Sequence, residues 1–340
     1  GFFCSLAAVA FTRALYFSNN LQNTAVGYEA LYNLHGGESN TAVGYSALLG
    51  DFGASEGFYN VACGAEALFN IEGGYSNIAT GYRALYNNGG NYSNMEDYRH
   101  GSYNIATGTE ALFSNQGGSY NIAIGDRALF TNEGDYYENY YNGDYNIAIG
   151  SKALFSVNPD DYYIESNACY NIGIGYHSLY NSTIGNGLVA VGHNLGLTSV
   201  DGNYNTFVGY GADAASGSLE NATAIGYNAV VDASNKVRLG NSNVTVIEGQ
   251  VDFTYTSDKN KKENFLDINH EKVLQKLSNF RIQSWNYKHD QDEIRHYGPV
   301  AQDFFTAFGH DGMGQVGSDT TLCGSDVNGI NMIAIQALEK

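Results

Sequence analysis

Small and β-branched residues recur in a fixed order over most of the chain, in the pattern Asn-x-Ala-(Ile/Val/Thr)-Gly-x-x-Ala-Leu-(Tyr/Phe). The common step is 17 residues, as from Gly108 to Gly125, and longer steps contain insertions. A repeat this short fits one coil of a β-solenoid and is too short for a pair of helices. The clear copies begin at Asn23, Asn40, Asn60, Asn77, Asn104, Asn121 and Asn146, and looser copies follow as far as Gly226.

Apolar and small residues alternate within each copy, which predicts a β-strand. The alternation places Ile147 and Ile149 on one strand face and the small residues on the other. We expect the Ile and Val face to line the interior of the coil, and the small-residue face to let another backbone approach closely. The segment 153–155 (Ala-Leu-Phe) is expected to form the second strand of its coil.

Insertions rich in Tyr, Asn and Asp follow the second apolar segment of several copies, at 91–100, 134–144 and 158–168. A solenoid tolerates loops at such a place. Tyr and Asn on protruding loops suit contact with a glycan or a protein receptor, although such loops can equally well decorate a scaffold.

The composition changes near residue 250, which predicts a domain boundary. Residues 1–250 carry 7 Lys and Arg against 22 Asp and Glu, whereas the remainder carries 9 against 13. Residues 1–22 are expected to be an N-terminal fragment, either the end of a signal peptide or a degenerate repeat. The repeats predict a solenoid over 23–234. Short β-branched segments predict a neck of strands over 235–256, and a mixture of helix and strand patterns predicts an α+β domain over 257–340.

Charge and cysteine spacing exclude several classes of partner. The net charge of -19 repels phosphate backbones and anionic lipid, so we expect no nucleic acid. No apolar run reaches the length of a membrane span, so no membrane insertion is expected. The 4 cysteines are far apart and fit no metal site, and no calcium-loop motif is present, so neither metal nor cofactor is expected.

A serine followed by a basic cluster comes at the start of the C-terminal domain, in Thr256-Ser257-Asp258-Lys259-Asn260-Lys261-Lys262. By itself this segment is typical of a solvated loop. A serine hydroxyl becomes a nucleophile when a base accepts its proton, and a lysine amine can do so in its neutral form. Like charges disfavour the charged form of an amine, and Lys259 and Lys261 lie beside Lys262. Lys261 would point to the opposite face if the segment were extended.

The order of motifs after residue 250 resembles the C-terminal intramolecular chaperone domain of endosialidase-type tailspikes, which is a self-cleaving peptidase family. The shared motifs are Ser257-Asp258 with Lys262, the aromatic segment 285–287, the segment 298–302 (Gly-Pro-Val-Ala-Gln), and an apolar terminal segment from Ile330. Many members carry Arg three residues after the serine, where this chain has Asn260. The family's C-terminal coiled coil is expected beyond the helix that ends this chain.

The resemblance implies a Ser-Lys dyad of Ser257 and Lys262, which would cut the chain once between Thr256 and Ser257. Asp258, Lys259 and Lys261 would support that site. The repeats resemble the head repeats of trimeric adhesins and phage fibres, which implies a left-handed β-solenoid (β-roll) and a homotrimer. The resemblance therefore implies a trimeric fibre or adhesin-like protein at a cell surface or on a virion, outside the cell. A non-cleaving structural or carbohydrate-binding adhesin is the alternative, and a glycan-degrading spike is disfavoured because the repeats offer no recognisable carboxylate pair.

Overall fold

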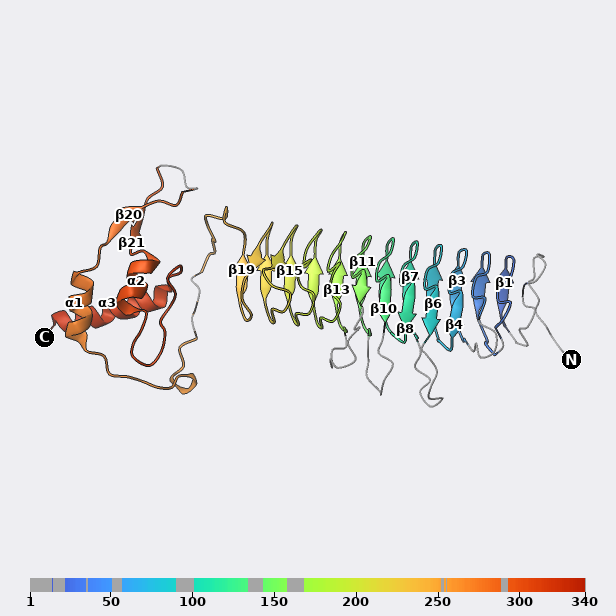
Figure 1. The fold of residues 1–340 in the computed structure, drawn as a ribbon, viewed down its shortest axis with the longest axis horizontal. Coiled ribbons are helices and arrows are strands. Elements are labelled where there is room, and N and C mark those ends of the chain that lie inside the picture. The colour runs from blue at the N-terminus through green and yellow to red at the C-terminus, as the bar shows by residue number, and fades with distance from the viewer. Residues whose placement is uncertain are drawn as a thin grey trace. The chain divides into compact units, whose positions relative to one another are not determined.

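The computed structural model describes residues 14, 22–34, 36–50, 57–89, 101–133, 143–157, 168–251, 254, 256–288 and 293–339. The chain forms two compact units, residues 1–242 and 243–340 (Figure 1). Most of the predicted N-terminal segment and most of the three insertions lie outside the described residues. No described helix is long and apolar enough to cross a membrane.

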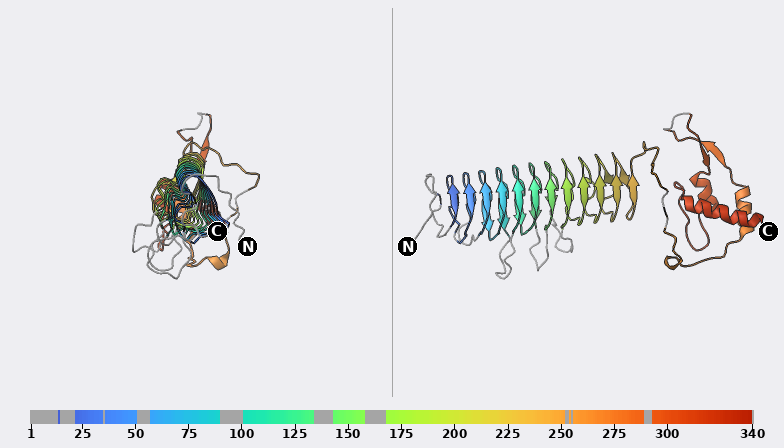
Figure 2. Two further views of the ribbon diagram at one scale, coloured as in Figure 1. Left: turned by 90° about the vertical axis from the view of Figure 1, so that its right-hand side faces the viewer. Right: turned by 180° about the vertical axis from the view of Figure 1, so that it is seen from behind.

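The first unit is a β-solenoid, as the repeats predict. Successive coils stack along one axis, and they superimpose when viewed end-on (Figure 2). One strand of each coil joins a 12-stranded parallel sheet whose register pairs equivalent motif positions, as in Ile122 with Ile147 and Ile147 with Ile172. Its strands are β1 (Thr24–Val26), β2 (Thr41–Val43), β3 (Val61–Cys63), β5 (Ile78–Thr80), β7 (Ile105–Thr107), β9 (Ile122–Ile124), β11 (Ile147–Ile149), β13 (Ile172–Ile174), β14 (Val189–Val191), β15 (Thr206–Val208), β17 (Thr223–Ile225) and β19 (Val237–Leu239).

The opposite side of the coils carries shorter parallel sheets. A five-stranded sheet is followed by a two-stranded one. Their strands are β4 (Asn70–Glu72), β6 (Asn87–Gly89), β8 (Ser114–Gln116), β10 (Thr131–Glu133) and β12 (Ser156–Val157), then β16 (Asp213–Ala214) and β18 (Val230–Val231). The second strand of a coil therefore begins after the Ala-Leu-(Tyr/Phe) segment, and the prediction of a strand over 153–155 is wrong. Leu154 has φ 48°, in the left-handed region that strands do not use.

The two faces of the main strands are reversed relative to the expectation from alternation. Ala148 is fully buried, whereas Ile147 is half-buried and Ile149 is 36% exposed on the outer face. The interior of a coil has room for alanine at this register because leucines from the turn occupy the rest of it; Leu154 is fully buried. Alternation alone assigns two faces without saying which one is inside, and the larger apolar face was the wrong choice.

The motif asparagines form a buried ladder that links the coils. Each side-chain Oδ1 accepts the backbone N–H of the equivalent residue one coil later, as Asn104 Oδ1 does from Asn121 at 2.9 Å. Most of the amides also donate to a backbone carbonyl, as Asn104 Nδ2 does to Gly118 at 2.9 Å. These bonds satisfy backbone groups at the corner where each strand begins, which explains why asparagine recurs there.

Glycine follows each main strand because the backbones of adjacent coils nearly touch there. Gly125 has φ 136°, and a Cβ on it would lie 2.6 Å from the carbonyl carbon of Gly150. Aromatic rings also stack from coil to coil, with centroids 4.9–5.1 Å apart along Phe69, Tyr86, Phe113, Phe130, Phe155 and Tyr180. A residue type repeated at one position thus becomes a continuous row.

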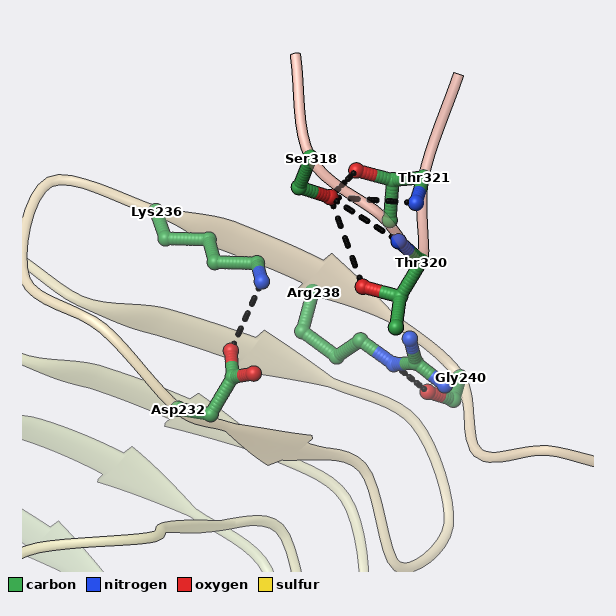
Figure 3. Close-up of polar contacts among 7 residues, drawn as sticks. All are labelled: Asp232, Lys236, Arg238, Gly240, Ser318, Thr320 and Thr321. Carbon is green, nitrogen blue, oxygen red and sulfur yellow. Dashed lines mark hydrogen bonds and ion pairs between the residues drawn. The ribbon is translucent and has the colours of Figure 1, made fainter. Parts of the chain in front are cut away.

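The second unit is small and α+β. It contains a 3₁₀ turn η1 (Lys259–Lys261), α1 (His270–Ser278), the antiparallel pair β20 (Gln283–Trp285) and β21 (His296–Gly298), α2 (Ala301–Phe308) and α3 (Gly324–Leu338). Its core is built on Val273, Phe304 and Phe308. In the loop before α3, the Ser318 hydroxyl accepts the N–H of Thr321 at 3.1 Å (Figure 3). The predicted class, a mainly β solenoid followed by a small α+β domain, is confirmed.

The segment 235–256 differs from the predicted neck. Its described part contains one strand, β19, and that strand pairs with β17 as the last strand of the solenoid sheet. The solenoid therefore continues beyond residue 234.

Candidate functional site

The Ser-Lys segment folds into a capped turn at the start of the second unit. Asp258 Oδ1 accepts the backbone N–H of Asn260 at 2.9 Å and its side-chain amide at 3.1 Å. At the other end, the backbone N–H of Lys262 donates to the carbonyl of Lys259 at 3.2 Å. Asp258 is the N-cap and Lys262 the C-cap of η1, so the turn is closed at both ends.

This turn brings the two predicted dyad residues together. Lys262 Nζ lies 2.6 Å from Ser257 Oγ and is hydrogen-bonded to it. One turn of 3₁₀ helix returns the chain on itself, which allows a contact between residues five apart. General-base activation of a serine requires that the base lies within hydrogen-bond distance of the hydroxyl, and this pair meets that requirement. Both side chains are exposed to solvent in this single chain.

The other sequence-predicted residues surround this pair without contacting the serine hydroxyl. Lys259 and Lys261 lie in η1 and are exposed, and Thr256 immediately precedes the serine. The condition under which Lys261 would point to the opposite face does not apply, because the segment is a 3₁₀ turn and not an extended strand. The described contacts to Ser257 Oγ nevertheless come from Lys262.

Two further motifs of the C-terminal domain meet in the antiparallel strand pair. Trp285 is paired with His296, and their rings stack with centroids 4.9 Å apart. The indole Nε1 of Trp285 donates to the carbonyl of Gly298 at 3.4 Å. The aromatic strand and the glycine segment, which are separate in the sequence, therefore form one hairpin-like pair that leads into α2.

A comparison with family models finds a match within this unit. Residues 257–313 match the family described as chaperone of endosialidase. The match begins at Ser257, the serine of the Ser-Lys pair. The name of the matched family is that of a peptidase family. It covers the second unit from Ser257 to the loop after α2, and we refer to residues 257–340 as the chaperone domain. No curated protein and no solved structure matches the chain.

No group of three or more His, Cys, Asp or Glu side chains within the described part of the chain is arranged to hold a metal ion. Sequence reasoning missed the asparagine ladder. The recurrence of Asn at the start of most copies of the repeat was the available signal, since a polar residue fixed at one register of a buried strand needs a partner in each coil.

Proposed function

We propose that the protein is a trimeric fibre or adhesin-like protein of a cell surface or virion, outside the cell, whose chaperone domain assists trimer folding and then cleaves itself from the shaft. The cut lies between Thr256 and Ser257 and happens once in each chain. The observation that carries this proposal is the 2.6 Å contact between Lys262 Nζ and Ser257 Oγ at the first residue of the chaperone match.

The first step is an acyl shift within the chain. Neutral Lys262 accepts the Ser257 hydroxyl proton while Ser257 Oγ attacks the carbonyl carbon of Thr256. The tetrahedral intermediate then collapses with loss of the C–N bond between Thr256 and Ser257. The proton passes from the lysine to the departing α-amino group of Ser257, which leaves Thr256 joined to the serine oxygen as an ester.

Water completes the reaction. It adds to the ester carbonyl, and the C–O bond to Ser257 breaks, so Thr256 ends in a carboxylate and Ser257 regains its hydroxyl. No cofactor enters this scheme. Asp258 contributes by capping the turn that holds Lys262 against Ser257. Only the unprotonated form of an amine can accept the hydroxyl proton.

The cut is tested by mass spectrometry and N-terminal sequencing of the full chain. The expected new N-terminus is Ser257, at the first residue of the chaperone match. Ser257→Ala removes the nucleophile and Lys262→Ala the base, so both chains should stay whole. Lys261→Ala is the matched control because it removes a neighbouring cation that does not contact the hydroxyl, and it should slow cleavage only modestly.

Two results would contradict this mechanism. Undiminished cutting in Ser257→Ala would exclude the serine as nucleophile, and equal losses in Lys261→Ala and Lys262→Ala would exclude a specific base. A chain that folds and trimerises but is never cut would instead support the alternative function, a non-cleaving structural or carbohydrate-binding adhesin.

The outer face of the 12-stranded sheet supports the trimer. The third position of its strands forms an outward row of β-branched side chains that are 36–40% exposed: Val43, Ile124, Ile149, Val191, Val208 and Ile225. A parallel sheet normally has both faces covered, and a single solenoid leaves this face in water. The small-residue face proposed from the sequence lies inside the coil, so we assign the seam between copies to the Ile and Val face.

Cys63 provides a direct test of this seam. It is exposed on β3, in register with Val43 of the apolar row. In a parallel trimer the copies of Cys63 lie at one level, so mild oxidation should give a disulfide-linked pair of chains. The control keeps Cys63 and replaces exposed Cys323 of the chaperone domain with serine. Two results would place the seam elsewhere. One is cross-linking that is lost when Cys323 is replaced, and the other is the absence of any cross-linking in a chain that is shown to be trimeric.

A row of tyrosines offers a surface for a receptor, either a glycan or a protein. Tyr103, Tyr120, Tyr145 and Tyr170 stack with centroids 4.8–5.2 Å apart and are 42–61% exposed. Their faces cover one another, so the ring edges and hydroxyl groups are what a ligand would meet.

A further inference from the structure

The last strand of the solenoid breaks the residue pattern of the others. β19 pairs with β17 so that Arg238 is in register with Ala224. Ala224 and its equivalent Ala190 are fully buried, because this register faces the interior of the coil. Arg238 therefore occupies an interior position of the repeat, yet it is exposed, because no described coil follows it.

Polar contacts hold this final turn in place (Figure 3). Lys236 Nζ pairs with Asp232 Oδ1 at 2.7 Å, across the turn that connects β18 to β19. Arg238 Nε donates to the carbonyl of Gly240 at 2.9 Å, just after β19 ends. The guanidinium is thereby kept beside the end of the sheet.

The edge of β19 would otherwise be suited to adding a strand. Among the described strands, β19 lies at the end of the sheet. Its residues Val237 and Leu239, on either side of Arg238, are 64% and 41% exposed. An open, apolar edge of a parallel sheet pairs readily with another chain. Among the described strands of this sheet, β1 is the other one with an unpaired edge, so β19 of one copy would meet β1 of a second copy. The repeat makes these two edges complementary, because every coil stacks on its neighbour in the same register.

We propose that Arg238 blocks the end of the solenoid against a second copy of this chain. A coil stacked on β19 would enclose the guanidinium at the register where the other coils bury alanine. The carbonyl of Gly240 accepts from Nε, but it does not neutralise the guanidinium. A charge enclosed without an ionic partner is strongly unfavourable, whereas a charge beside water is not. An inward-register charge on an edge strand is one of the ways in which proteins prevent sheets from joining.

The distribution of cations agrees with this role. Residues 1–250 contain 7 Lys and Arg, and two of them, Lys236 and Arg238, lie at the terminal strand. The proposal goes beyond the self-cleavage and does not depend on it. It applies to the intact chain, and it applies equally to a shaft released at Thr256, which would retain β19.

The test compares Arg238→Ala with the wild-type full chain by size-exclusion chromatography with light scattering and by electron microscopy. We expect the variant to form particles joined end to end, with masses that are multiples of the wild-type particle. The concentration at which they appear should fall by about tenfold or more, which corresponds to about 1.4 kcal/mol. Using the wild-type particle as the unit makes the result independent of whether that particle is a trimer.

Two control variants separate the local effect from net charge. Arg127→Ala removes the same charge in mid-array, where Arg127 pairs with Glu110 at the surface, and should behave as wild type. Arg238→Lys keeps a cation at the edge and should also stay unjoined. If Arg238→Ala fails to fold, Arg238→Gln replaces it, because the amide keeps much of the side chain and loses only the charge.

The proposal is overturned if neither neutral variant associates more than wild type. It is overturned equally if Arg127→Ala associates to the same extent, since the loss of any surface arginine would then have the effect and the register of Arg238 would not be its cause. Amorphous aggregates with lost β-sheet signal indicate misfolding, and the decision then rests on Arg238→Gln.

Discussion

Asn104 and Asn121 hold equivalent places in the buried ladder but make different hydrogen bonds, which gives a matched pair of substitutions. Asn104 accepts the N–H of Asn121 and also donates to the Gly118 carbonyl, both at 2.9 Å. Asn121 accepts the N–H of Asn146 at 2.8 Å, but its own Nδ2 is buried without a partner within the described residues. The carbonyl that Asn121 would reach by analogy, that of Gly143, accepts from Asn132 instead.

The free-energy cost of alanine should therefore differ between the two sites. Asn104→Ala leaves the buried N–H of Asn121 unpaired, at about 1–3 kcal/mol, and loses the bond to Gly118, at about 1 kcal/mol. Asn121→Ala also leaves one N–H unpaired, but it removes an unpaired amide of similar cost, so these two terms nearly cancel. The cavity left by the side chain is the same in both variants, and Asn104→Ala should be less stable by about 2 kcal/mol or more.

The assay combines urea unfolding with native-state hydrogen exchange. Each variant removes the acceptor of one backbone amide. Asn104→Ala should therefore speed hydrogen exchange at the amide of Asn121, and Asn121→Ala should speed it at the amide of Asn146. That shared loss shows that each substitution acts on the ladder. The unfolding midpoint should fall clearly in Asn104→Ala only, because repeats unfold through their weakest local interfaces.

Equal destabilisation by the two substitutions would refute this account of the ladder. It would mean that the volume of the asparagine side chain, and not its hydrogen bonds, stabilises the corner of the coil. Unchanged exchange at both amides would refute the ladder itself.

Three further outcomes follow from the same coils. Ala148→Asp buries an unpaired charge and should destabilise the coil by several kcal/mol, which circular dichroism would detect as loss of β-sheet signal. Ile149→Asp should leave the coil folded but weaken the trimer, which light scattering would detect as a lower mass. Gly125→Ala sets a Cβ against the backbone of the next coil at positive φ and should lower the melting temperature of the solenoid. Burial raises the pKa of the Cys169 thiol to about 11, so it should resist alkylation at pH 8, where exposed Cys323 reacts; equal rates would contradict its burial.

The sequence by itself determined the repeat architecture, and it predicted the contact between Ser257 and Lys262. The step from Gly108 to Gly125 fixes a coil length, because equivalent backbone atoms must stack at one sheet spacing. The separation of Ser257 and Lys262 is short enough that a single turn controls it, so local sequence contains the needed information. Asp258 signals that turn through its capping preference.

Only the tertiary structure decided which face of each strand lies inside. Alternation gives Ile149 and Ala148 opposite faces, but the choice between them depends on how much room the leucines of the turn leave in the coil. The role of Arg238 was hidden for the same reason. Its register with buried Ala224 is a relation between two coils, and a charge at that register is tolerated only because no described coil encloses it.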